Sequence, residues 1–148
     1  MTIAREFLSD TLIDEMQNYF GLGYKAYNDD EDLELDPNWD TYKALQDSNL
    51  LFIFTVRDGS KLVGYAWYIA MPSLHSKSTI FAAADTIYLD KDYRGRFLGI
   101  KLFKYAEEVL KENKITLVLY SVKVYENWGK LLERLGYKQS EVTYQKRI

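Results

Sequence analysis

The chain has 148 residues, a formal net charge of −3 and no cysteine. Its length suits a single domain over residues 1–148, and 47% apolar with 28% charged residues is typical of a globular protein. Disulfides and thiolate metal sites are excluded, the one histidine excludes His-rich metal sites, and the acidic balance argues against general nucleic-acid binding. We therefore expect no metal. Without an apolar leader or a run of roughly 20 apolar residues, the sequence predicts a cytoplasmic protein that does not span a membrane.

The first predicted elements are a short strand and an amphipathic helix. The strand covers about Ile3 to Phe7, and apolar residues at helical spacing follow from Leu12 to Phe20. Thr11 suits a capping-box start for this helix, and we expect Gly21 and Gly23 to mark its end.

An acidic run from Asn28 to Asp36 comes next, with six carboxylates among nine residues. Such a run is usually a solvated loop whose like charges repel. The alternative is an acidic lip that attracts a cationic substrate. Beyond it, Asp36-Pro37-Asn38 suits the entry to a short helix through Trp39, Tyr42 and Leu45.

The remaining pattern predicts strands and helices in alternation. Asp58-Gly59 is a hairpin turn signal, and Gly136 suits a helix C-cap. We expect strands at 50–57, 61–71, 79–89, 115–122 and 137–146, and helices at 98–113 and 126–135. The order β-α-α-β-β-β-α-β-α-β predicts an α/β fold with a mostly antiparallel sheet and a helical crossover after the fourth strand.

The segment from Ile87 to Ile100 carries the strongest chemical signal. A strand ends, a turn with two arginines and two glycines follows, and a helix begins inside that turn. Helix N-termini present unpaired N–H groups and partial positive charge, so this arrangement suits an anion, most simply a pyrophosphate. A plain strand–turn–helix with a solvated basic turn fits the same residues.

This segment resembles motif A of the GNAT superfamily of N-acetyltransferases, whose pattern is Gln/Arg-x-x-Gly-x-Gly/Ala. Arg94 matches its first position and Gly99 its last, whereas Phe97 stands at the internal glycine. The stretch from Trp128 to Tyr137 resembles the helix and Gly-aromatic stop of motif B. Three further segments resemble a phage and bacterial branch of the family: Asp36-Pro37-Asn38-Trp39, Leu74-His75-Ser76-Lys77-Ser78-Thr79 and 131–137.

The resemblance implies a GNAT-type sheet of six to seven strands, flanked by about four helices and splayed between its fourth and fifth strands. It implies acetyl-coenzyme A (acetyl-CoA) as cosubstrate, with the pantetheine arm along Tyr88 and Leu89, either of whose backbone amides would also serve as oxyanion donor. The pyrophosphate would lie on the turn formed by Arg94, Gly95, Arg96, Phe97, Leu98, Gly99 and Ile100. The Phe97 amide stays available if its ring points back into the helix packing.

Candidate catalytic groups are sparse. Residues 83, 85, 87 and 89 share one face of the predicted strand, so Asp85 could face the cleft, and partial burial that raises its pKa would suit it as general base. A structural role for Asp85 fits equally. The position of the family's tyrosine acid holds Leu132, so Tyr125 is the first substitute, with Tyr120 and Tyr137 behind it. A role in the core is the favoured alternative for each of these three tyrosines. His75 suits acceptor binding, proton shuttling or a structural role.

The leading hypothesis is direct acetyl transfer to a primary amine, on a small molecule or a peptide, in a ternary complex. With no cysteine, an acyl-cysteine intermediate is excluded. A GNAT-fold binding or interaction module that has lost catalysis, and transfer of another acyl group, are the alternatives. The sequence leaves a homodimer open.

Overall fold

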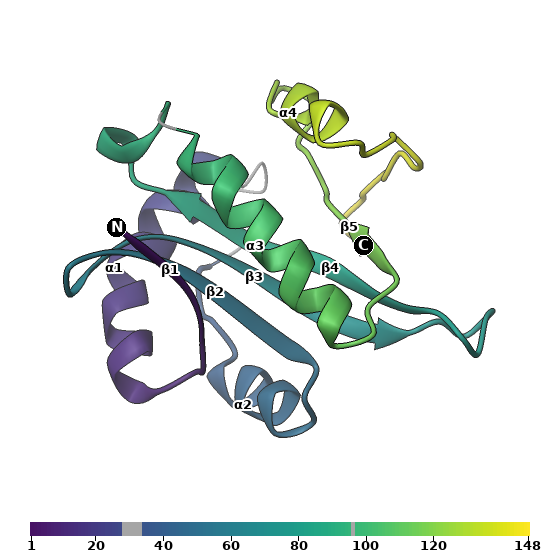
Figure 1. Cartoon of the computed structure of the whole chain (residues 1–148), viewed down its shortest axis with the longest axis horizontal. Coiled ribbons are helices and arrows are strands. Elements are labelled where there is room, and N and C mark those ends of the chain that lie inside the picture. Colours follow the sequence, from purple (N-terminus) through teal and green to yellow (C-terminus); the bar gives the residue numbers. More distant parts are fainter. Residues whose placement is uncertain (28–33, 96) are drawn as a thin grey trace.

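Helices cover both faces of a five-stranded sheet (Figure 1). The computed structural model describes residues 1–27, 34–95 and 97–148, with only the backbone path for 21–27. The strands lie side by side in chain order, and all pairs are antiparallel except the last, which is parallel. They are β1 Thr2–Glu6, β2 Leu51–Asp58, β3 Lys61–Pro72, β4 Ile80–Leu89 and β5 Leu117–Leu119.

Four α-helices and one short 3-10 turn are present in the described ranges. In Figure 1 α3 crosses in front of the sheet, whereas α1 passes behind it and α2 lies below it, on the same face as α1. Their bounds are α1 Asp10–Tyr27, α2 Trp39–Asp47, the 3-10 turn Lys91–Tyr93, α3 Leu98–Glu112 and α4 Gly129–Arg134. The α/β class, the mainly antiparallel sheet and the crossover helix are therefore confirmed.

Two predictions for the C-terminal part are wrong. The strand expected at 115–122 shortens to β5, and residues 137–148 form no strand, so the described sheet has five strands rather than six or seven. Alternation in the tail does not bury an apolar face, because Val142 and Tyr144 are both exposed. A strand that covers no core and joins no ladder has little to stabilise it.

The ends of α1 also differ from the prediction. Ser9, not Thr11, accepts the capping hydrogen bond, from the Leu12 N–H to its Oγ at 3.2 Å. The helix passes through Gly21 and Gly23 and ends at Tyr27. Glycine lowers helix stability by roughly 1 kcal/mol without forbidding helical dihedrals, so a glycine alone is a weak stop signal.

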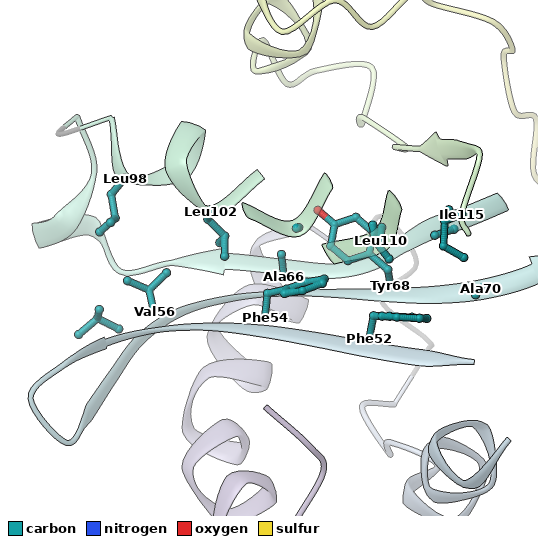
Figure 2. Close-up of a cluster of buried hydrophobic side chains, with 13 residues drawn as sticks. Phe52, Phe54, Val56, Ala66, Tyr68, Ala70, Leu98, Leu102, Leu110 and Ile115 are labelled. Atoms are coloured by element: carbon teal, nitrogen blue, oxygen red, sulfur yellow. The ribbon is translucent and has the colours of Figure 1, made fainter. Parts of the chain in front are cut away.

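Each face of the sheet carries its own core. The first packs the apolar side of α3 on β2 and β3, where Leu98 lies over Val56, and Leu102 and Leu110 lie beside Phe54 and Tyr68 (Figure 2). The second lies under α1 and α2 and is rich in aromatic residues: Tyr19, Phe20, Trp39, Tyr42, Tyr65, Trp67 and Tyr88. Side chains of β4 pack into both cores, which hold the strand in place from both sides. The sheet opens at the outer edge of this strand.

Candidate active site

β4 and β5 part after three residue pairs. Their parallel pairing joins Phe81–Ala83 to Leu117–Leu119, and no strand pairs with β4 beyond Ala83 on that side within the described residues. On the inner side the Asp90 N–H donates to the Val63 carbonyl at 2.9 Å. Since main-chain groups alternate along a strand, those of Leu89 face the open edge and those of Tyr88 face β3. The expected splay is confirmed, and beyond Ala83 it leaves this edge of β4 without a neighbouring strand in the described residues.

A cavity of about 960 Å³ lies along this opening. Its walls include Ile87, Leu89 and Leu102 from the α3 side of the sheet, and Tyr42 and Tyr65 from the α1/α2 side. The cavity therefore passes from one face of the sheet to the other beside β4. Two reactants that enter from opposite faces can meet there.

A β-bulge in β4 sits at the middle of this cavity. On β3, Trp67 pairs with Thr86 and the next residue, Tyr68, pairs with Ala84, so Asp85 has no cross-strand partner. A bulge inserts one residue and reverses the alternation beyond it. Ala84 and Ile87 accordingly both pack on the α3 core, and the predicted common face of residues 83, 85, 87 and 89 is wrong.

Asp85 faces α2 and lines the cavity. The Tyr42 hydroxyl donates to its Oδ2 at 2.6 Å, and the carboxylate is exposed instead of partly buried as expected. Burial, followed by the hydrogen bond and charge of Asp85, raises the pKa of Tyr42 above its ordinary value. Tyr42 is therefore protonated at neutral pH and acts as the donor.

The turn after β4 is held by its own arginine. The Arg94 Nε donates to the Leu89 carbonyl at 2.8 Å, which ties the turn to the open edge. The first helical hydrogen bond of α3 runs from the Lys101 N–H to the Phe97 carbonyl, so the N–H groups of Leu98, Gly99 and Ile100 precede the helical ladder. Arg96 lies outside the described residues.

Phe97 adopts a left-handed backbone conformation with φ of +56° and caps α3 without a side-chain hydrogen bond. Its ring is 73% exposed, so it does not point back into the helix packing. Left-handed dihedrals cost a residue with a Cβ roughly 1–2 kcal/mol, which explains why the family pattern has glycine at this position.

Phe97→Gly is therefore expected to raise the free energy of unfolding. Relief of the backbone strain exceeds the added entropy of the unfolded chain, giving a gain of about 0.5–1 kcal/mol and a Tm higher by a few degrees. Gly95→Ala is expected to lower the free energy of unfolding, because Gly95 has φ of +82°. The space around its Cβ position is open, so the loss comes from backbone strain and not from a clash. Thermal unfolding of both variants checks this, and a lower Tm for Phe97→Gly contradicts the strain argument.

Gly99 leaves open space at the start of α3. A Cβ built there meets only the Leu89 Cδ2, at 4.0 Å, so packing within the described protein does not require glycine. The residue also lines the cavity. Because glycine has no side chain, position 99 leaves room for a ligand beside the helix N-terminus. A glycine here therefore fits a site that holds the pyrophosphate and pantetheine of acetyl-CoA.

The three tyrosines considered as acids occupy different places. Tyr125 is 54% exposed and is not part of the cavity wall. The Tyr120 hydroxyl shares a hydrogen bond of 2.6 Å with the Tyr68 hydroxyl, and the Tyr137 hydroxyl donates to Glu107 Oε1 at 2.6 Å. The Tyr120 and Tyr137 rings meet edge-on, with centroids 5.1 Å apart. Burial raises the pKa of both above the tyrosine value, and neither lines the cavity. Leu132, at the family's acid position, is buried.

His75 lies in the β3–β4 loop, at the end of β4 opposite the turn. Its backbone N–H donates to the Ser73 Oγ at 3.3 Å and its side chain is exposed. The five-residue step from Ile80 to Asp85 alone spans roughly 17 Å. The structure therefore does not bring His75 together with Asp85.

A protein-family model described as the acetyltransferase (GNAT) family matches residues 10–137. The chain belongs to the GNAT acetyltransferase family. No curated protein sequence matches it. The GNAT fold places β4, the turn and α3 where motif A was predicted, and Gly136 follows α4 with φ of +96°, as the C-cap prediction required.

Solved GNAT structures match nearly the whole chain. A ribosomal-protein-alanine N-acetyltransferase from Brucella melitensis biovar Abortus 2308 is 18% identical with a TM-score of 0.73, and the match covers 100% of both chains. An aminoglycoside acetyltransferase from an uncultured soil metagenomic sample is 14% identical with a TM-score of 0.78, covering 99% of this chain and 95% of the other. A putative acetyl transferase from Pyrococcus furiosus is 21% identical with a TM-score of 0.75, covering 99% of each. At these identities the likeness shows the fold.

Sequence reasoning missed the Tyr42–Asp85 contact. The two residues are 43 positions apart, and the sequence placed Tyr42 only on the short helix that follows the acidic run. A sequence signal for the bulge would have revealed the direction of the Asp85 side chain, but the alanines at 82–84 and Asp85 give no such signal.

In the part of the chain that the structure describes, no helix is long and apolar enough to cross a membrane.

Proposed function

We propose that the protein transfers the acetyl group of acetyl-CoA directly to a primary amine in a ternary complex. The observation that carries the proposal is the cavity that runs from the α3 N-terminus, along the open edge of β4, to Asp85. Family membership supports the cosubstrate, because the residues at the turn match the family's pyrophosphate motif. The cavity supports direct transfer, since both reactants reach the same edge.

Acetyl-CoA is assigned to the α3 side. The N–H groups that precede the helical ladder of α3 bind the pyrophosphate, helped by the helix dipole. The pantetheine arm lies along the open edge of β4 as an added strand, beside Leu89, whose carbonyl accepts from the Arg94 Nε. An N–H on the same edge, from Leu89, donates to the oxyanion that forms at the thioester carbon.

The acceptor is assigned to the α1/α2 side. Carboxylates and aromatic rings surround that arm of the cavity, and both stabilise a cationic amine through charge and cation–π contacts. They are Glu34, Asp36 and Asp85 with Phe20, Tyr42 and Tyr65. Residues 28–33 of the acidic run lie outside the described residues.

Asp85 is assigned as the general base. An alkylammonium with a pKa near ~10.4 costs about 4–5 kcal/mol to deprotonate at neutral pH. Asp85 takes one proton, the nitrogen lone pair forms the N–C bond, and the C–S bond breaks to release the thiolate. The second nitrogen proton passes to that thiolate directly or through water. A thiol pKa near 8.5 makes the thiolate a tolerable leaving group without a protein acid.

A GNAT-fold module that binds CoA without catalysis is the second candidate, because Leu132 is buried where the family's acid belongs. Release of free thiol from acetyl-CoA, measured across linear, aromatic and peptide amines, separates the two. Transfer is expected, with the acceptor gaining the mass of one acetyl group. Binding of acetyl-CoA without thiol release across the panel contradicts the proposed transfer and favours the binding module.

A further inference from the structure

We propose that Tyr42 is a positioning residue, which holds one oxygen of the Asp85 carboxylate and leaves the other to accept a proton from the acceptor amine. The inference rests on the proposed function, since it gives Tyr42 a part in transfer. It gives a residue of α2 a defined task beside the proposed base on β4.

The contact itself is specific. The Tyr42 hydroxyl donates to the Asp85 Oδ2 at 2.6 Å, within the range of an O–H···O⁻ bond to an ionised carboxylate. Both side chains line the cavity. Among the described residues Asp85 has no second hydrogen-bond partner, so its Oδ1 is left for the acceptor.

The Tyr42 ring is fixed before any substrate binds. It meets the Trp67 ring edge-on, with centroids 5.3 Å apart and an interplanar angle of 90°, and it packs on Trp39 at 5.8 Å. Trp67 is fully buried, so the ring against which Tyr42 packs is itself held in place by the core. A ring held by packing places its hydroxyl without an ordering cost at the moment of reaction.

Asp85 needs such a support because of where it lies. As the bulge residue it has no partner on β3, and its side chain is exposed. An exposed aspartate ordinarily samples several rotamers. A hydrogen bond to one oxygen restricts that rotation, and it keeps the second oxygen aimed at the amine while the proton moves.

Tyr42→Phe tests the inference, because it keeps the ring and removes only the hydroxyl. We expect kcat to fall by about tenfold with the KM for acetyl-CoA unchanged, the pattern of an interaction that acts in the transition state. Tyr19→Phe is the matched control. The Tyr19 hydroxyl donates to the Leu62 carbonyl at 2.8 Å in the same aromatic core, and Tyr19 does not line the cavity. It should lower stability to a similar degree and leave kcat unchanged.

A second readout is independent of turnover. The ¹³Cζ resonance of Tyr42 should shift in Asp85→Ala, which removes the carboxylate that accepts from the Tyr42 hydroxyl, and it should stay in place in Asp47→Asn, at an exposed residue at the end of α2. A Tyr42 resonance that does not move in Asp85→Ala overturns the contact and with it the inference. An active wild type in which Tyr42→Phe and Tyr19→Phe have equal kcat overturns the positioning role while the proposed function stands. If the Tyr42 resonance shifts in Asp85→Ala but the wild-type protein transfers no acetyl group, both the proposed function and a positioning role of Tyr42 in transfer are contradicted.

Discussion

Asp85→Asn is expected to lower kcat by roughly 100- to 10,000-fold, the range typical of losing a general base. Asparagine keeps the size of the side chain and an oxygen that accepts from the Tyr42 hydroxyl, so the geometry at the bulge survives. Binding of acetyl-CoA should not change, because the cosubstrate is assigned to the opposite side of β4. Steady-state kinetics with a fixed amine, together with thermal shifts by acetyl-CoA, measure the two effects separately.

Asp47→Asn is the control for this variant. Asp47 is an exposed carboxylate at the end of α2 and is not part of the cavity wall. Its replacement removes the same charge near the same helix and should leave kcat unchanged. Equal rates for wild type and Asp85→Asn would remove Asp85 from the mechanism, and a comparable loss in Asp47→Asn would show that net charge, not a base, is responsible.

Gly99→Ala should weaken acetyl-CoA binding by at least tenfold, about 1.4 kcal/mol, while the unliganded protein becomes slightly more stable. The added methyl group enters the cavity where it meets protein only at 4.0 Å. Alanine is also favoured over glycine inside a helix by roughly 0.5–1 kcal/mol. Weaker acetyl-CoA binding together with a higher stability of the unliganded protein would indicate a lost ligand contact, whereas a damaged fold would lower both.

Gly129→Ala provides the comparison. Gly129 begins α4, and its added Cβ meets Val122 at 3.9 Å, an ordinary contact outside the cavity wall. Thermal unfolding with and without acetyl-CoA should show the ligand-induced shift retained in Gly129→Ala and diminished in Gly99→Ala. If Gly99→Ala binds acetyl-CoA as the wild type does, the ligand does not pass beside this residue.

The elements with strong periodicity were predictable from the sequence. α3 begins and ends within one residue of the prediction because its apolar stripe is continuous and its first turn follows a glycine-bearing loop. β2 and β3 follow from a hairpin signal at Asp58-Gly59 between two apolar runs. The strand–turn–helix that carries the family motif was located for the same reason, since it depends on residues close in sequence.

What the sequence did not reveal depends on partners distant in the chain. The bulge at Asp85 arises from the pairing register of β3 with β4, which local alternation cannot foresee. The hydrogen bond from Tyr42 requires α2 to pack over that bulge. The tail beyond Tyr137 alternates like a strand, yet the described structure gives it no core to cover. Each difference reflects tertiary contacts that override a local pattern.

Acetyl-CoA binding tests the central claim most directly. Thermal unfolding is compared in acetyl-CoA and in inorganic phosphate at equal concentrations, which separates a cosubstrate cavity from a turn that binds any anion. At roughly 100 times the Kd, a ligand specific to the folded protein adds about 2.7 kcal/mol, or several degrees in Tm for a chain of this size. The account predicts that shift with acetyl-CoA and little change with phosphate. No shift with acetyl-CoA, or an equal shift with phosphate, would contradict it.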